Sequence, residues 1–295
     1  PEENIFDKAS MDLGLGFDDS DFERKEKITA GTKTSYNAKV CSPLWFEAEG
    51  EVDPDKYTLQ LKYSADYHFH QGNYETAAMK YEQLLELIPM SNMPMRQDVQ
   101  ESLCRSYTKL GRHKDSTAIA YTMVEQMRHE DDARQRQSLL LLSQACKAAK
   151  DWTGCICAVE ELASRQSQYA PFWLELGRAY LQRFKDRGDS LQHLPQIVTC
   201  FVRARILLES VLHTVGKVAR EKSETTIGKI DAELQELDAS QTVIDQAKEA
   251  TRSDIEYNTA PADDEEDHAS ANKTQAFNSD AFRKRWFSWT DKLDR

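Results

Sequence analysis

Apolar residues recur at helical spacing along most of this 295-residue chain, and polar segments separate the apolar stretches. Residues 1–34 carry few apolar side chains and a cluster of acids, so we expect a disordered acidic N-terminal segment. Residues 35–57 include Trp45 and Phe46 and are predicted to form an aromatic strap that packs on the helices. From 58 to 184 the pattern is that of consecutive helices. The chain is therefore predicted to be all-α.

The stretch FWLELGRAY at 172–180 has the spacing W-x2-L-G-x2-Y, which opens a tetratricopeptide (TPR) repeat. An earlier turn, QGNY, contains Gly72, and glycine adopts the backbone conformation that an inter-helix turn requires. Gly111 and Lys150 follow at equal steps of 39 residues. Repeat units are therefore expected to start near residues 58, 97, 136 and 170. They predict a degenerate TPR-type helical-repeat superhelix, right-handed, of three to four units.

The region after the repeats is predicted to be helical as well. A polar insertion at 185–195 precedes a helical cap or heptad region at 196–250, and an acidic disordered linker is expected at 251–278. A heptad pattern in the 227–244 segment raises the possibility of self-association through a helical seam. Its apolar positions are Ile227, Ile230, Leu234, Leu237 and Ile244.

Residues 279–295 are predicted to form a terminal amphipathic helix with one aromatic face. The predicted docking residues on that face are Phe282, Trp286, Phe287 and Trp289. Three placements are open: the helix folds back on the repeats, docks on a partner protein, or lies on a membrane surface through Arg283, Lys284 and Arg285. Folding back is favoured, because an apolar stripe of this kind needs a constant partner.

The concave groove of TPR arrays, lined by the first helix of each unit, is the predicted partner site. The repeat template places nine residues there: Lys62, Asp66, Phe69, Arg105, Lys109, Lys147, Leu174, Arg178 and Leu181. Arg105, Lys109, Lys147 and Arg178 would form a basic stripe, which favours an acidic or mixed peptide, since arginine grips carboxylates with two hydrogen bonds. The alternative is that these are ordinary solvated side chains. The carboxylate clamp of chaperone-binding TPR domains is matched only at Lys62, so chaperone tails are not expected as ligands.

The net charge of −12 argues against nucleic acid or an anionic membrane as the main partner, because both attract dense lysine and arginine. No run of about 18 apolar residues is present to span a bilayer. The first residues lack a secretory pattern, and Pro1 in place of methionine suggests a fragment. The six cysteines include no C-x2-C pair, which favours reduced thiols in the cytoplasm, with the nucleus as an alternative.

No catalytic motif points to an enzyme: P-loop, GxGxxG, GxSxG and HExxH are all missing. His68 and His70 are two residues apart and would point to different faces of a helix, so neither a metal nor another cofactor is expected. Cys104 and Cys155 fall at template positions that require small residues, which gives them a packing role. The predicted function is a non-enzymatic adaptor or complex subunit, monomeric, that binds a peptide or helix of a partner protein. The alternative is a structural subunit that self-associates through 227–244.

The segments SYNAKVCSPLWFEAE, MRQDVQESLCRSYTKLGRHKDS, APFWLELGRAYL, CFVRARILLESVL and FRKRWFSW occur in this order. Together they resemble the uncharacterised family named for human chromosome 8 open reading frame 76. The resemblance extends from about Tyr36 to the C-terminus. It implies a soluble TPR-like protein without established activity, in which the aromatic strap and the terminal helix form one unit with the repeats.

Overall fold

A computed structural model describes residues 44–47, 54–187, 194–259 and 277–292. The described residues form eleven α-helices and two short 3-10 helices, and they contain no strand. The chain divides into two compact units, Pro1–Trp45 and Phe46–Arg295, and nearly all described residues belong to the second. The predicted N-terminal segment 1–34 lies outside the described residues.

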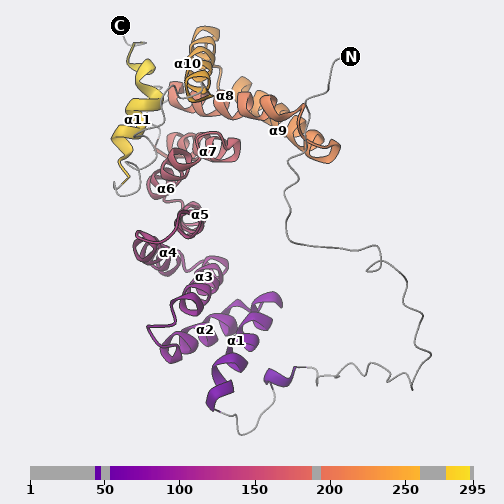
Figure 1. The fold of residues 1–295 in the computed structure, drawn as a ribbon, viewed down its shortest axis with the longest axis vertical. Coiled ribbons are helices and arrows are strands. Elements are labelled where there is room, and N and C mark those ends of the chain that lie inside the picture. The colour runs from indigo at the N-terminus through magenta and orange to yellow at the C-terminus, as the bar shows by residue number, and fades with distance from the viewer. Residues whose placement is uncertain (1–43, 48–53, 188–193, 260–276, 293–295) are drawn as a thin grey trace, which may run out of the picture. The chain divides into compact units, whose positions relative to one another are not determined.

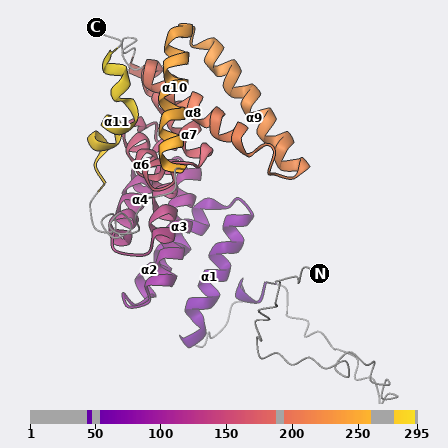
Figure 2. The same ribbon diagram turned by 45° about the horizontal axis from the view of Figure 1, so that its top comes forward.

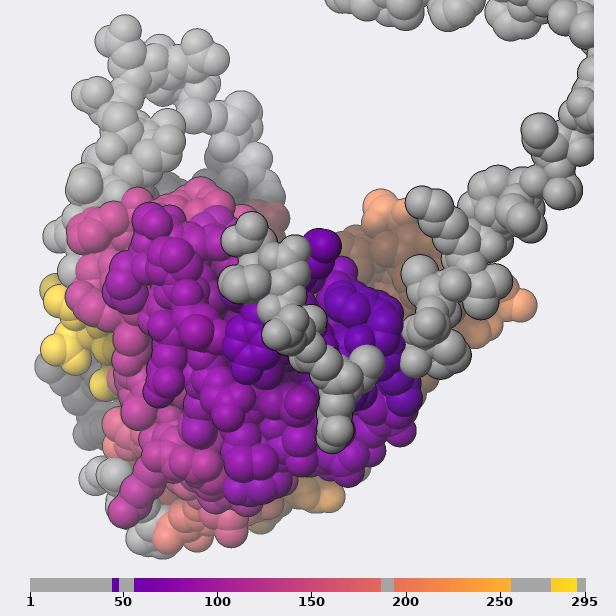
Figure 3. Space-filling model, turned by 90° about the horizontal axis from the view of Figure 1, so that it is seen from below, coloured from indigo at the N-terminus to yellow at the C-terminus, as the bar shows by residue number. Residues whose placement is uncertain are grey.

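Seven helices form the repeat region, and each packs on the next one along the chain (Figure 1). They are α1 (Pro54–His70), α2 (Tyr74–Leu87), α3 (Met93–Lys109), α4 (His113–Met127), α5 (Asp132–Ala148), α6 (Trp152–Arg165) and α7 (Ala170–Arg187). Helices α1 and α2 build the N-terminal end of this stack, which faces the viewer in Figure 3. The prediction of an all-α helical-repeat fold is confirmed.

Four further helices follow the repeats: α8 (Leu194–Val211), α9 (Lys217–Glu236), α10 (Gln241–Thr259) and α11 (Ser279–Phe287). Helix α8 packs on α7 and contacts both α9 and α10 (Figure 2). Helix α11 packs on α6 and continues into the 3-10 helix η4 (Ser288–Lys292). At the other end, the 3-10 helix η2 (Trp45–Glu47) precedes α1.

Three inter-helix turns share one backbone geometry, and they fall at the residues that set the repeat phase. Gly72, Gly111 and Lys150 have φ angles of 82°, 75° and 58°. Each turn is closed by a hydrogen bond from the next residue's N–H to the carbonyl five positions earlier, the Schellman arrangement: Asn73 to His68, Arg112 to Tyr107 and Asp151 to Cys146. Lys150 adopts this left-handed conformation at a cost of about 1 kcal/mol relative to glycine.

Small residues are buried where consecutive helices cross. Ala65, Ala77, Cys104, Ser116 and Cys155 have no exposed surface, and they recur at two equivalent positions of the units. At Gly177 a Cβ atom would come within 2.9 Å of the Phe201 ring, so only glycine lets α8 approach α7 this closely. The fourth unit therefore uses α8 as its second helix, although residues 188–193 separate the two helices in sequence.

The predicted heptad region is not one helix. The chain turns between α9 and α10 at Asp238, where φ is 48°. Ile230 and Leu234 are buried in the core that α8 and its neighbours share, and Leu237 and Ile244 pack against the same core. Four of the five apolar positions of the 227–244 segment therefore pack within the chain, on the core that α8 shares.

Several predicted boundaries were wrong. The polar insertion was predicted at 185–195, whereas α7 continues to Arg187 and α8 begins at Leu194. Helix α10 continues to Thr259, nine residues into the predicted linker 251–278, because Ala247, Thr251 and Ile255 form a stripe at four-residue spacing that packs on the core. Residues 54–57 belong to α1 rather than to the strap, since Pro54 begins the helix, a position that suits proline.

Candidate functional site

The first helices of the four units lie side by side, and polar side chains link each one to the next. We call this surface the first-helix face; it consists of the outward side chains of α1, α3, α5 and α7. Lys62 on α1 reaches Asp98 on α3 at 2.8 Å. Gln137 on α5 donates to Glu101 on α3 at 2.7 Å. In each pair the two residues are 36 positions apart, and the two pairs occupy equivalent positions of consecutive units. The repeat therefore produces the same link twice.

The next links along the face are also polar. Lys147 on α5 lies 2.6 Å from Glu175 on α7. Arg178 on α7 donates three hydrogen bonds to the carboxylate of Glu233 on α9, at 2.6, 3.1 and 3.3 Å. Helix α9 therefore adjoins the C-terminal end of the first-helix face, a position that the heptad pattern did not indicate.

The predicted basic stripe is largely neutralised. Arg105 pairs with Glu101 of its own helix at 2.6 Å and also reaches Gln144 of α5 at 3.4 Å. Together with Lys147 and Arg178, three of the four stripe residues have an acidic partner. Lys109 is exposed at the end of α3. The acids come from other helices or from another turn of the same helix, which is why the stripe looked purely basic along the sequence.

The predicted residues on α1 form a compact cluster. Asp66 accepts hydrogen bonds from the Lys62 ammonium at 2.9 Å and from the Tyr81 hydroxyl at 2.7 Å. Burial by itself lowers the pKa of Lys62, but hydrogen bonds to Asp98 and Asp66 outweigh it, so the pKa is raised and the charge is retained. Phe69 is half-buried, with its ring 5.4 Å from that of Tyr74. These residues stabilise the α1–α2–α3 junction.

The apolar residues predicted for the groove belong mainly to the core. Leu181 is buried, and Leu174 is half-buried against the same cluster. Leu140, which the repeat template also places on the concave face, is 38% exposed on α5. It lies between Gln137 and Gln144 in sequence, one turn from each, and so supplies an apolar position within the polar first-helix face.

The terminal aromatic helix folds back on the repeats. Phe282, Trp286 and Phe287 are buried and Trp289 is half-buried. The Trp173 ring stacks on Phe282 at 5.8 Å and meets the edge of Trp286 at 5.1 Å. The tryptophan of the W-x2-L-G-x2-Y motif is therefore the surface on which α11 rests, as well as a core residue.

A buried carboxylate anchors α11. Glu160 on α6 has no exposed surface, and it accepts hydrogen bonds from Arg283 of α11 at 2.9 Å and from the Tyr180 hydroxyl at 2.5 Å. Burial and the Glu160 charge raise the pKa of Tyr180 well above its usual value, so the phenol remains a donor. A buried charge is stable only when it is paired and hydrogen-bonded, and Arg283 provides the opposite charge.

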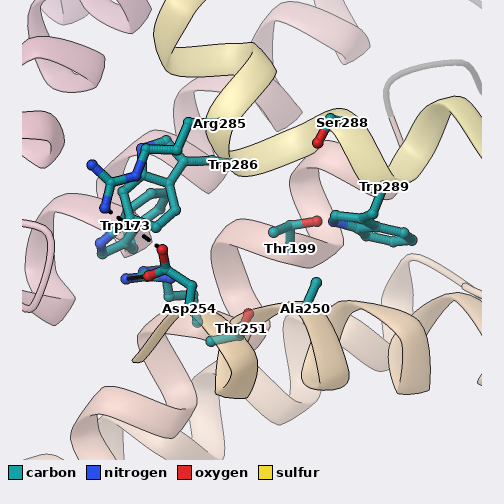
Figure 4. Close-up of a pocket in the computed structure, with 10 residues that line it drawn as sticks. Trp173, Thr199, Ala250, Thr251, Asp254, Arg285, Trp286, Ser288 and Trp289 are labelled. Atoms are coloured by element: carbon teal, nitrogen blue, oxygen red, sulfur yellow. Dashed lines mark hydrogen bonds and ion pairs between the residues drawn. The ribbon is translucent and has the colours of Figure 1, made fainter. Parts of the chain in front are cut away.

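A second charged junction joins α8, α10 and α11. The guanidinium groups of Arg203 and Arg285 each lie 4.2 Å from the centroid of the Trp286 ring. Figure 4 shows Arg285 beside Trp286. Asp254 on α10 pairs with Arg203 at 2.8 Å and with Arg285 at 3.6 Å. Arg203 is buried, which lowers its pKa, yet a guanidinium keeps its proton in proteins.

Sequence reasoning missed this junction because its members are far apart along the chain. Arg203 stands in the run IVTCFVRARILL, and a single arginine on the buried side of an apolar helix was the available signal. The buried carboxylate that anchors α11 was missed for the same reason. In sequence, Glu160 resembles an ordinary solvated helix residue, and nothing local distinguishes it from Glu161. Its burial depends on α11, 123 positions later.

Cys104 and Cys155, which the repeat template predicted to be packing residues, are buried, and so is Cys146. Burial raises the pKa of Cys104, of Cys146 to about 11 and of Cys155 to about 12. Since the thiolate is the nucleophile, these three thiols are poorly suited to covalent catalysis. Among the described residues, no group of three or more His, Cys, Asp and Glu side chains is placed to hold a metal ion.

Comparisons with known proteins identify relatives of this chain. The model of a family of unknown function (DUF5588) matches residues 12–192. The chain is 31% identical over 170 residues to the "Uncharacterized protein C8orf76 homolog" of Rattus norvegicus, covering 57% of this chain and 45% of that protein. It is 30% identical over 171 residues to "Uncharacterized protein C8orf76" of Homo sapiens, covering 57% and 44%. The resemblance inferred from the sequence is confirmed.

The chain spans less than half the length of these curated relatives. No solved structure matches it. Within the part of the chain that the structure describes, we find no helix with the length and apolar character needed to cross a membrane.

Proposed function

The chain belongs to the family of unknown function DUF5588, and we propose its function from its own geometry: a non-enzymatic adaptor or complex subunit whose first-helix face holds a peptide or helix of a partner protein. We propose further that the repeats are of the TPR type. The buried Trp173, Leu176 and Tyr180 of the signature support this assignment, as do the recurring left-handed turns.

The observation that carries the proposal is the set of links between first helices. Lys62–Asp98, Gln137–Glu101 and Lys147–Glu175 tie four successive first helices together. Side chains held this way lose little further freedom when a ligand arrives, and such preorganisation favours binding. A ligand that lies across the face would meet a row of polar groups with Leu140 as an apolar contact.

The charge distribution on α3 favours a mixed-charge partner over a strongly acidic one. Asp98 stands in the N-terminal half of α3 and Glu101 at its middle, whereas Arg105 and Lys109 stand in its C-terminal half. A matching segment carries a basic group toward the first pair and an acidic group toward the second. We expect such a partner in the cytoplasm or nucleus, where reduced thiols persist.

A charge-reversal experiment tests the proposal. We expect the double variant Arg105→Glu, Lys109→Glu to lose its partners at least tenfold in quantitative affinity capture, with little change in thermal stability, because both side chains are exposed. The matched control reverses Lys114 on α4 and Arg128 directly after it, both exposed, and is expected to retain the partners. Arg178 is left intact, since its pair with Glu233 joins α7 to α9.

Site-specific cross-linking provides a second test. A photo-reactive residue at Leu140 on α5 is expected to capture the same partner that the charge reversal loses. The control position is Met79 on α2, which is 50% exposed and lies on a second helix of a unit. Equal capture from both positions, or capture from Met79 alone, would contradict binding at the first-helix face.

A further inference from the structure

A cavity of about 110 Å³ lies where α7, α8, α10 and α11 meet η4 (Figure 4). Its lining includes Arg203, Thr251, Asp254, Arg285, Ser288 and Trp289. One water molecule takes up roughly 30 Å³ in the liquid, so the space suits a ligand of a few heavy atoms. Three parts of the chain build this cavity: the α7–α8 pair, α10, and α11 with η4. It shares Arg203, Asp254 and Arg285 with the Trp286 junction.

Two buried polar atoms in the lining have no hydrogen-bond partner among the described residues. They are the Oγ1 of Thr251, a residue only 2% exposed, and the Nε1 of Trp289. An indole nitrogen can only donate, and a buried donor without an acceptor costs free energy. The cavity therefore suits a group that accepts hydrogen bonds.

The charges around the cavity favour an anion. Arg203 and Arg285 contribute two positive charges and Asp254 one negative charge, so the lining carries a net charge of +1. Asp254 is held by Arg203 at 2.8 Å and by Arg285 at 3.6 Å. Arg285 makes the longer of these two contacts. Its guanidinium can turn toward an anion while the ion pair between Asp254 and Arg203 remains.

Ser288 brings a hydroxyl to this cavity from the end of α11. Its side chain is exposed, and Figure 4 shows its hydroxyl directed into the space toward Thr199 and the indole nitrogen of Trp289. Arg285 and Arg283 precede Ser288 by three and five positions. Kinases select substrates partly by such patterns of charge.

We propose that Ser288 is a phosphorylation site and that its phosphate occupies this cavity, where Trp289 Nε1 and Thr251 Oγ1 donate to it and Arg285 pairs with it. The phosphoryl donor is ATP, and the catalyst is a protein kinase that recognises basic substrates. The Ser288 Oγ–P bond forms as the bond to the γ-phosphate of ATP breaks; ADP leaves, and the kinase base takes the hydroxyl proton. The segment must detach from the repeats to enter the kinase.

Phosphorylation then strengthens the docking of α11. A phosphate opposite arginine gains charge-assisted hydrogen bonds, and it satisfies two donors that are otherwise unpaired. Two effects oppose it: the charge of Asp254 and the negative end of the α11 dipole. The Asp254 charge is already paired with Arg203, and the helix dipole acts at the exposed end of α11. The new hydrogen bonds, in contrast, form in a buried space. We therefore expect net stabilisation of the docked helix.

The direct test places phosphoserine at position 288 of the full chain by genetic-code expansion. Amide hydrogen exchange across 279–292 is expected to slow about tenfold, equivalent to about 1.4 kcal/mol. Phosphoserine at exposed Ser91, outside this region, is the charge-matched control and leaves the exchange unchanged. The isosteric variant Thr251→Val and the smaller aromatic variant Trp289→Phe should each reduce the slowing, because each removes one donor. Unchanged or faster exchange after phosphoserine at 288 would overturn the proposal.

Two further measurements separate related explanations. Inorganic phosphate added to the unmodified chain should slow exchange less than phosphoserine at 288; a larger effect of the free ion would assign the cavity to a free anion instead. A kinase with basic-substrate specificity and ATP should modify Ser288 in the wild-type chain, mapped by mass spectrometry, and not in Ser288→Ala. Failure to modify Ser288 would remove it as a kinase site.

Discussion

Arg283 of α11 and Glu160 of α6 form an ion pair at 2.9 Å although 123 positions separate them in sequence. The carboxylate has no exposed surface, whereas the guanidinium is 38% exposed. The pair therefore links the stability of the repeats to the presence of the terminal helix.

The single variant Arg283→Ala should destabilise the chain more than the double variant Arg283→Ala, Glu160→Gln, which removes both charges of the pair. Arg283→Ala leaves Glu160 buried with only Tyr180 as a donor, which we expect to cost about 3 kcal/mol. Adding Glu160→Gln should restore a part of this loss, because a neutral amide costs less to bury than an unpaired carboxylate. Urea unfolding followed by circular dichroism measures both. Equal stability of the single and the double variant would show that Glu160 is accessible to water.

Because α7 and α8 approach closely at Gly177, its replacement by alanine should lower the stability of the chain. A Cβ there would be 2.9 Å from the Phe201 ring and 3.1 Å from Cys200, so we expect Gly177→Ala to destabilise the chain by about 1–3 kcal/mol. The control is Gly228→Ala on α9, where no atom lies within 4 Å of the new methyl group. It should stabilise the chain by up to about 1 kcal/mol through helix propensity. Thermal melts that shift both variants in the same direction would contradict this packing.

Leu234 tests whether the heptad pattern serves the chain's own core. Because Leu234 is only 9% exposed, Leu234→Asp is expected to destabilise α9 and α10 by several kcal/mol. Val218→Asp, at a position 81% exposed on the same helix, should leave stability within about 0.5 kcal/mol of the wild type. Mass photometry with circular dichroism distinguishes the outcomes. A wild-type dimer that dissociates into folded Leu234→Asp monomers would instead support self-association through 227–244.

The buried thiols should make stability fall in alkaline solution. The pKa of Cys146 is raised to about 11 and that of Cys155 to about 12, from a usual value of 9.0. A raised pKa means that the folded state holds its proton longer, so this stabilisation is complete below pH 9 and is lost as the pH rises toward 11–12. Between pH 8 and 10 we expect a loss of about 1 kcal/mol for each thiol.

Paired variants isolate this effect from other alkaline titrations. The loss of unfolding free energy between pH 8 and 10 should shrink in the double variant Cys146→Ala, Cys155→Ala. It should be unchanged in Cys157→Ala, since Cys157 is exposed. Denaturant unfolding at the two pH values provides the measurement. An identical pH dependence in all three proteins would show that the two thiols titrate normally in the folded state.

Local features of the sequence determined the helices and the turns between them. Gly72, Gly111 and Lys150 predicted the turns because a left-handed residue and its closing hydrogen bonds involve only six neighbouring positions. The buried small residues followed from the same periodicity. The start of the linker was predicted wrongly. The acidic composition that begins at residue 259 suggested a linker from 251 onward, whereas Thr251 and Ile255 pack on the core.

The partners of the charged residues were decided by the tertiary structure alone. Arg178 finds Glu233 across 55 positions, and Arg203 finds Asp254 across 51. Helical periodicity predicts which face of a helix is polar. It does not predict which of the many acidic residues in the chain will pair with a given exposed arginine. Only the packing of α9, α10 and α11 around α7 and α8 brings one acid within hydrogen-bond distance. The sequence by itself therefore determined a helical-repeat architecture, and the three-dimensional contacts determined which charges remain available to a partner.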